Sequence, residues 1–336
     1  MTPRYEAPSR STSGTDADLL DQLRHADGRP YGFYKNALGA WDYGDFTLAI
    51  DHVQADPYAP PSSLRAYATP EAMGLPEAAL ASSDARLAAA DFIARSFDEA
   101  IRARGARDVS IARAGALILQ RSYATVLPDR VEVRFQVKLP ARGRTILGKS
   151  AARLFDVDVP NIVMDCFDFV SEDPDTTRKR SRLLAHVAAY EDYRALQGIL
   201  EERGWVSFVA DDALLARRSG ISETPLTGDG VVAFSAPESL RATVTLPHAG
   251  EVSGMAIPPG LTLIVGGGYH GKSTLLEAIA QGVYAHIPGD GRELVATDPT
   301  ATKVRAADGR AVTGVDISPF ITHLPGGADT TSFSTE

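Results

Sequence analysis

The sequence predicts a mixed α/β fold made of two domains. Residues 131–139 alternate apolar and polar side chains, which is typical of a half-buried strand. Residues 85–104 and 176–203 carry apolar residues at helical spacing. Residues 261–265 form a short apolar run that leads through a glycine-rich loop into a further helix. With 336 residues, of which 44% are hydrophobic, the chain is long enough for two such domains.

The N-terminal domain is expected over residues 17–165. It follows a polar, Ser/Thr-rich tail at 1–16, which we predict to be disordered. A helix is expected from Asp18 to Ala26 and a strand from Phe46 to Val53. The helix at 85–104 has one apolar face, which is formed by Leu87, Ala90, Ile93, Ala94, Phe97 and Ile101.

A basic segment overlaps the alternating strand at 131–139. Further strands are expected before it, within residues 110–119 and 125–127. Glu132 is the only acid between residues 130 and 153 of this otherwise acidic chain. The basic residues of the segment are Arg130, Arg134, Lys138, Arg142, Arg144, Lys149 and Arg153. They indicate either a solvated sheet face with a basic turn or a patch that binds nucleic-acid phosphates.

The second domain is expected over residues 166–336 and contains the long helix at 176–203. After this helix, the apolar run at 205–210 ends in Asp211 and Asp212. An acidic strand end of this kind can hold Mg²⁺ in nucleotide-binding proteins. Asp211 also suits the N-cap of a short helix that would follow it, and we favour this second interpretation.

The strongest motif is the glycine-rich loop, which fits G-x-x-x-x-G-K-[ST] and lies between the apolar run at 261–265 and a helix. Its glycines let backbone N–H groups converge on phosphates, and the start of the helix adds a positive dipole. Lys272 is expected to reach the β- and γ-phosphates, and Ser273 to ligate Mg²⁺. His270 would either bond a phosphate or shape the loop. The expected nucleotide-binding residues are Gly266, Gly267, Gly268, Tyr269, His270, Gly271, Lys272, Ser273 and Thr274.

The same pattern recurs at residues 143–150. Its variable positions are bulky, Thr145 and Ile146 are β-branched, and no apolar strand leads directly into it. Such residues resist the left-handed backbone that a phosphate-binding loop needs. We therefore reject this match as a nucleotide loop.

Composition narrows the function further. The net charge of −9 disfavours nonspecific nucleic-acid binding by the whole surface, although it leaves room for a local basic patch. The single cysteine, Cys166, cannot form an intrachain disulfide and is expected to be a buried apolar residue. The sequence shows no signal peptide and no membrane-spanning run, which favours a cytoplasmic protein.

Residues 255–280 (MAIPPGLTLIVGGGYHGKSTLLEAIA) resemble the start of an ABC-type ATPase domain, although two loop positions that are usually small are bulky here. Residues 282–293 (GVYAHIPGDGRE) and 315–325 (VDISPFITHLP) extend the resemblance to the predicted ATPases of the ABC class. Upstream, residues 44–65 and 139–155 resemble the N-terminal domain of that family. The resemblance therefore covers nearly the whole chain.

The resemblance implies an ATPase that uses ATP and Mg²⁺ and couples ATP binding or hydrolysis to a conformational change. It also implies a homodimer of the full-length protein, because such sites close between two protomers. After Ser273 the sequence shows no ABC signature and no acidic Walker B strand, so we expect a fragment with an incomplete P-loop NTPase (ABC-like) domain. An open sheet edge would make this chain poorly soluble by itself. The alternative is a module that binds RNA through residues 130–153 and uses ATP as a clamp switch.

Overall fold

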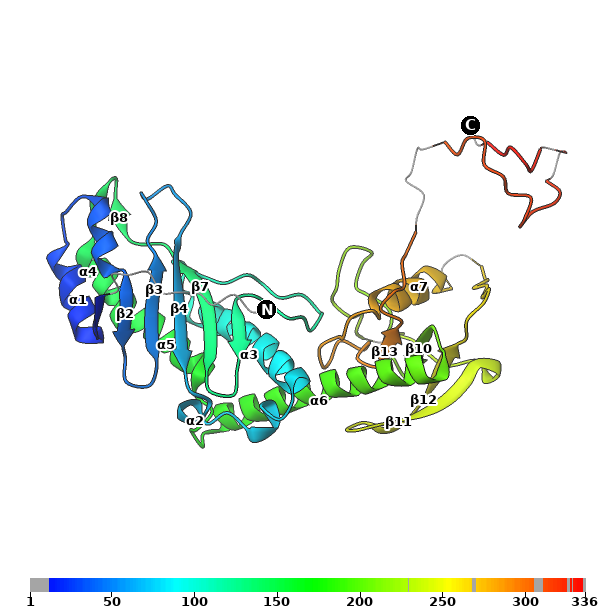
Figure 1. Ribbon diagram of the computed structural model, residues 1–336, viewed down its shortest axis with the longest axis horizontal. Helices are drawn as coiled ribbons and strands as arrows, with labels where there is room; N and C mark the ends of the chain where they lie inside the picture. Colours follow the sequence, from blue (N-terminus) through cyan, green and yellow to red (C-terminus); the bar gives the residue numbers. More distant parts are fainter. Residues whose placement is uncertain are drawn as a thin grey trace. The chain divides into compact units, whose positions relative to one another are not determined.

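The computed structural model describes residues 12–228, 230–267, 270–304, 311–324, 327 and 329–334. The chain divides into two compact units, Met1–Thr300 and Ala301–Glu336. Helices and sheets both build the first unit, which confirms the predicted α/β class (Figure 1). In the second unit, Val315 forms an isolated antiparallel bridge with Phe333. Among the described residues, none of the helices has the length and apolar character needed to span a bilayer.

A seven-stranded sheet organises the N-terminal part of the first unit. Its strands are β1 (Thr12–Thr15), β2 (Gly39–Asp42), β3 (Thr47–His52), β4 (Ser62–Ala68), β5 (Val109–Ser110), β6 (Ala124–Val126) and β7 (Val131–Val137). Their order is β1-β2-β3-β4-β7-β5, and β6 also pairs with β7. Only β1 and β2 are parallel; the other pairs are antiparallel. Val131, Val133, Phe135 and Val137 all lie in the core, as the alternating pattern predicts.

Helices pack beside this sheet and around α3 (Figure 1). They are α1 (Asp16–His25), α2 (Pro70–Met73), α3 (Ser83–Arg104), α4 (Gly148–Arg153) and α5 (Val159–Phe167), with 3-10 turns at Tyr31–Ala37 and Glu77–Ala79 and a π turn at Leu154–Asp158. The Ser82 hydroxyl accepts the Ala85 N–H and so caps the start of α3. Gly105, at φ +61°, ends it in a left-handed conformation. Both helices expected in this part of the chain are therefore confirmed.

The long helix α6 (Pro174–Arg203) contacts the N-terminal helices and the second sheet. Asp173 caps its first turn by accepting the Asp175 and Thr176 N–H groups. Near its C-terminal end, the Tyr193 hydroxyl donates to the Gly282 carbonyl, and the Gln197 amide donates to the Thr297 carbonyl. The helix therefore joins the two sheets of the first unit (Figure 1).

The second sheet contains β10 (Ser207–Ala210), β11 (Arg241–Leu246), β12 (Gly250–Ile257) and β13 (Val295–Thr297), in the order β11-β12-β10-β13. Every pair in it is antiparallel. Helix α7 (Lys272–Gln281) packs on β10 and β13, and a 3-10 turn at Glu238–Leu240 precedes β11. A small core of Val209, Met255, Ile257, Ala278 and Val295 holds α7 against this sheet.

Two predictions about the N-terminal part are wrong in detail. Thr12–Thr15, expected within the disordered tail, form β1, because β2 offers a partner strand and Thr15 caps α1. The tail residues 1–11 lie outside the described residues. Residues 111–119 are not a strand, because β5, which pairs with β7, ends at Ser110.

The acids after β10 do not have the role predicted for them. Residues 212–217 are not helical, so Asp211 caps no helix. Its carboxylate instead accepts hydrogen bonds from the Ala236 N–H at 2.6 Å, Arg241 at 2.7 Å and the Ser253 hydroxyl at 2.8 Å. These long-range partners fix the turn after β10 and outweigh the local capping signal.

Cys166 is buried, as expected. Its thiol donates to the Ile93 carbonyl, and burial raises the pKa of the thiol to about 12. The group is therefore protonated and inert at neutral pH.

Candidate functional site

The glycine loop turns sharply into α7. Gly266 has φ +149° and Gly271 has φ +80°, two backbone conformations that L side chains rarely adopt. Gly271 is the residue before the first turn of α7, which starts at Lys272 as predicted. Gly268 and Tyr269, two of the expected ligands, lie outside the described residues. Gly266 and Gly271 thus have the positive φ that the sequence predicts for the glycines of the motif.

The N-terminus of α7 has no side-chain cap among the described residues. Its first backbone N–H groups have no partner within the helix, and the helix dipole makes this end positive. α7 is ten residues long, so the dipole extends over several turns. This combination with a left-handed glycine suits a bound anion, and phosphate most of all.

Two loop side chains lie against the loop backbone. The Lys272 ammonium donates a short hydrogen bond to the Gly267 carbonyl. The His270 ring lies beside Gly267, where a Cβ would come within 3.1 Å of ring atom Cε1. A larger residue at 267 would push the His270 ring aside, and the ring helps to shape the loop.

A cavity of about 490 Å³ lies beside α7. Its lining includes Ser273 and Thr274 of the motif, and Glu277 and Gln281 one and two turns further along the helix. The facing wall is the irregular segment from Arg217 to Glu223, with Arg292 below. Sequence reasoning missed this wall, because it carries no motif and lies about fifty residues before the loop. A larger cavity of about 600 Å³ between α3 and α6 is remote from the loop side chains, so it is not the candidate.

Two arginines that line the cavity, Arg217 and Arg292, are held by buried polar contacts. Arg292 is almost fully buried and donates to the Leu215 carbonyl and, at 2.8 Å, to the Gln281 side chain. Burial, together with the nearby charge of Arg217, lowers the pKa of Arg292 to about 10, so it remains a cation at neutral pH. Arg217 is paired with Asp290 at 2.5 Å. These bonds fix the two arginines in place at the cavity.

The apolar run before the loop is not the buried strand that the sequence predicts. Residues 261–267 are irregular, and the side chains of Leu261, Leu263 and Val265 are 86%, 75% and 83% exposed. A strand requires a neighbour to accept its backbone hydrogen bonds. No strand among the described residues pairs with this run, and the second sheet is antiparallel throughout.

The second motif match is not a phosphate loop, as predicted. Its residues form the hairpin β8 (Ala141–Arg142) and β9 (Thr145–Ile146), followed by α4. The Gly148 N–H at the start of α4 donates to the Asp27 carboxylate at 2.7 Å. The protein's own carboxylate thus occupies the position that a phosphate would need.

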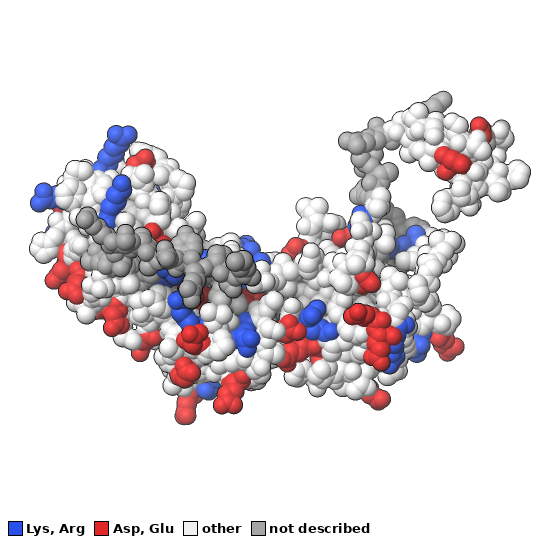
Figure 2. Space-filling model, viewed as in Figure 1, with Lys and Arg blue, Asp and Glu red and all other residues white. Residues whose placement is uncertain are grey.

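Only some of the basic side chains in the segment at 130–153 are available to bind an anion. Arg130 and Arg134 both bind the buried Glu132, and so does Arg65 from β4. The remaining basic residues of the segment are exposed, and no ion pair is found for them in the described part of the chain; they are Lys138, Arg142, Arg144, Lys149 and Arg153. In Figure 2, Lys and Arg side chains project at the end that carries β8 and α4 in Figure 1.

Two family models match the chain. Residues 179–336 match the P-loop domain model of the ABC ATPases, and residues 16–169 match a family model described as ATPase of the ABC class N-terminal. An uncharacterized protein of Methanocaldococcus jannaschii is 33% identical over 138 residues, which cover 39% of this chain. The chain spans only 31% of the length of that relative.

Proposed function

Because the chain belongs to the ATPases of the ABC class, we propose that its glycine loop binds the phosphates of Mg·ATP. The ligands are the backbone N–H groups of the loop and of the first turn of α7, over residues 266–274. Lys272 leaves the Gly267 carbonyl and neutralises the β- and γ-phosphates, while the Ser273 hydroxyl ligates Mg²⁺. Mg·ATP supplies the phosphoryl group, and these residues stabilise the negative charge that develops on it.

One observation carries this proposal. The N-terminus of α7, which no described side chain caps, follows a left-handed glycine and opens beside a cavity lined by Ser273 and Thr274. The second match to the same pattern lacks this arrangement, because Asp27 blocks its helix. The two motifs therefore offer an internal comparison between a loop that can accept a phosphate and one that cannot.

The test is calorimetric titration of Mg·ATP into the full chain. Lys272→Ala removes the cation of the loop and should weaken affinity at least tenfold, which corresponds to about 1.4 kcal/mol. Lys149→Ala removes the equivalent lysine of the rejected motif and should leave the affinity unchanged. Equal affinities for Lys272→Ala and the unaltered chain would remove Lys272 from the site.

We extend the proposal to the full-length protein in three respects: its domain bounds, the effect of ATP hydrolysis and its oligomeric state. Its N-terminal domain covers residues 17–165 and its P-loop domain starts at 166. ATP hydrolysis in the full-length protein drives a conformational change, and the site closes between two protomers of a homodimer. The exposed apolar run at 261–265 supports this extension, since it offers a surface that further protein can cover.

A second candidate function is RNA binding, with ATP as a clamp switch. It is favoured by Arg142 and Arg144 at the β8–β9 turn, which are exposed and form no ion pair with any residue that the structure describes. If they contact phosphates, RNA affinity should fall steeply as salt rises. Arg142→Ala with Arg144→Ala should then make the salt dependence shallower, by about 0.7 in slope for each lost contact to a single strand. Filter binding at several salt concentrations measures this, and a slope that the double substitution leaves unchanged excludes the patch.

A further inference from the structure

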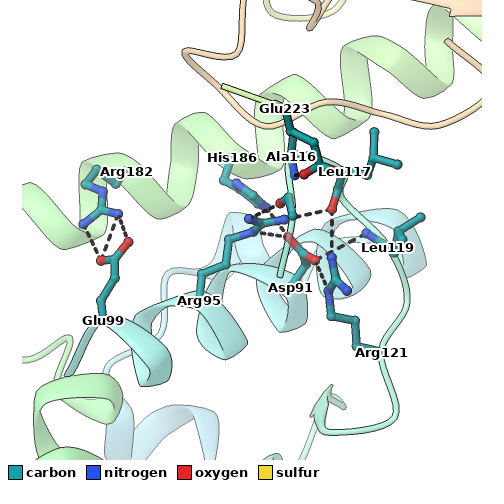
Figure 3. Close-up of polar contacts among 11 residues, drawn as sticks. Asp91, Arg95, Glu99, Ala116, Leu117, Leu119, Arg121, Arg182, His186 and Glu223 are labelled. Atoms are coloured by element: carbon teal, nitrogen blue, oxygen red, sulfur yellow. Dashed lines mark hydrogen bonds and ion pairs between the residues drawn. The ribbon is translucent and has the colours of Figure 1, made fainter. Parts of the chain in front are cut away.

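Residues Gly115–Arg121, which we call the clasp segment, lie between the N-terminal helices and the cavity beside α7. The segment is irregular, although the sequence predicts a strand over its first five residues, 115–119. Its backbone polar groups are nevertheless bonded on both sides (Figure 3). Hydrogen bonds to residues that are distant in the sequence therefore determine the path of this segment.

On one side, charged side chains of α3 and of the clasp segment hold its backbone. Arg95 donates to the Gly115 carbonyl at 2.6 Å and to the Leu117 carbonyl at 2.8 Å. Arg121 donates to the same Leu117 carbonyl at 3.0 Å. The fully buried Asp91 anchors both arginines, at 2.6 and 2.7 Å. This side of the clasp segment is thus tied firmly to the N-terminal domain (Figure 3).

On the other side, the clasp segment bonds to the chain that follows α7. The Ile118 N–H donates to the Ala285 carbonyl at 2.8 Å, and the Ile287 N–H donates to the Ala116 carbonyl at 2.9 Å. These are sheet-like bonds, and Leu117 forms an antiparallel bridge with His286. The segment consequently spans from the N-terminal domain to the P-loop domain.

One further contact links the clasp segment to the cavity wall. The Ala116 N–H donates to Glu223 Oε2 at 3.1 Å, and Glu223 lines the cavity together with Ser273 and Thr274. The carboxylate approaches so closely that a Cβ at Gly115 would lie 2.5 Å from Oε2. Gly115 has no positive φ, so a larger residue here would first meet the Glu223 carboxylate, which would have to shift away. The side chain of Glu223 is exposed, which leaves its carboxylate free to move.

We propose that Glu223 is a positioning residue that couples nucleotide occupancy of the cavity to the clasp segment and hence to the N-terminal domain. This inference rests on the proposed nucleotide site. The phosphates of Mg·ATP remain negative and repel a carboxylate in the same cavity. Bound Mg·ATP therefore displaces Glu223 from the cavity wall, which breaks the hydrogen bond from Ala116 and loosens the clasp segment. Coupling of this kind is reciprocal. A change that stabilises the clasp segment should therefore weaken nucleotide binding by the same factor by which the nucleotide destabilises the clasp segment.

The test is hydrogen-exchange mass spectrometry of the full chain, on peptides that cover the clasp segment, with and without saturating Mg·ATP. In the unaltered chain, Mg·ATP should speed exchange of these amides at least about fivefold, the lower end of ordinary coupling. Glu223→Gln keeps the acceptor but removes the charge, so its exchange should be slow with or without Mg·ATP. Glu223→Ala and Gly115→Ala both break the contact and should exchange fast in either condition.

Gly198→Ala is the matched control, because Gly198 lies in α6 with open space around its Cα. It should respond to Mg·ATP as the unaltered chain does. Exchange that stays constant in the unaltered chain, while calorimetry shows bound Mg·ATP, would overturn the coupling. A full response in Glu223→Gln would overturn it too. Absence of Mg·ATP binding by calorimetry would identify the nucleotide site itself as the failure, and the coupling would fall with it.

Discussion

At the scale of residues, long-range ion pairs decide which charges are available. Glu132 looked like an isolated acid in a basic strand, yet it is buried and binds Arg65, Arg130 and Arg134. Burial raises the pKa of Glu132, but the hydrogen bond from Arg134 and the nearby arginine charges outweigh this and lower it. The sequence could not reveal the pairing with Arg65, because that residue lies on another strand. The polar side of an alternating pattern is thus not always a solvated side.

Asp91 and His186 form a second buried polar pair. His186 Nε2 lies 3.1 Å from Asp91 Oδ2. Burial raises the pKa of Asp91, but the hydrogen bond from His186, the charge of Arg95 and the hydrogen bonds from Arg95 and Arg121 lower it to about 2. Burial lowers the pKa of His186 more than Asp91 raises it. At neutral pH the carboxylate is therefore charged and the imidazole neutral.

This pair predicts loss of stability in acid. The unfolded chain protonates His186 near its ordinary pKa of about 6.5, whereas the folded chain does so only at lower pH. The unfolded state thus binds more protons below about pH 6.5, and stability falls as pH falls. The Asp91 contribution has the same sign and is lost from about pH 4 down toward its folded pKa of about 2.

Thermal melts of the full chain at pH 5, 6 and 7 measure this dependence. The melting temperature should decrease as the pH is lowered from 7 to 5. His186→Gln still donates a hydrogen bond to Asp91 but cannot titrate, so its melting temperature should depend less on pH. His52→Gln, a substitution at an exposed position on β3, is the control and should keep the original slope. Identical slopes for His186→Gln and the unaltered chain would contradict the role of His186.

At the scale of elements, the local sequence pattern predicts a helix or strand correctly when the element has its own caps or a strand to pair with. The helices α3 and α6 have their own caps and glycine stops, and β7 has neighbours on both sides, so their patterns predicted them correctly. The apolar run at 261–265 has an equally clear strand pattern, but it lacks a partner strand in the described part of the chain. A strand pattern therefore predicts a structure only when a neighbouring strand is present.

The exposure of this run predicts a small effect of substitution. Leu263→Ser should change the free energy of unfolding by less than about 0.5 kcal/mol, since the side chain is 75% exposed. It should also reduce self-association, because the run is apolar. Urea unfolding and size-exclusion chromatography over a concentration series measure the two effects. A loss of about 2–5 kcal/mol, typical of a truncated core leucine, would show that the run is buried in solution.

At the scale of the whole molecule, the candidate site combines segments that are distant in sequence. The motif at 266–274 was readable because its chemistry is local: glycines, a lysine and a hydroxyl on consecutive residues. The wall at 217–223 and the clasp segment have no such pattern, because their positions depend on Arg95, Asp91 and Ala285 elsewhere in the chain. Sequence reasoning therefore found the phosphate loop and missed its surroundings.

The central claim is that backbone N–H groups at the start of α7 bind phosphate. A nitrogen–proton correlation spectrum of the labelled full chain, recorded with and without saturating Mg·ATP, tests it most directly. The amide signals of Gly271, Lys272, Ser273 and Thr274 should shift strongly, and those of Lys149 and Ser150 in the rejected motif should not move. Signals at 271–274 that remain in place at saturating Mg·ATP would contradict the account.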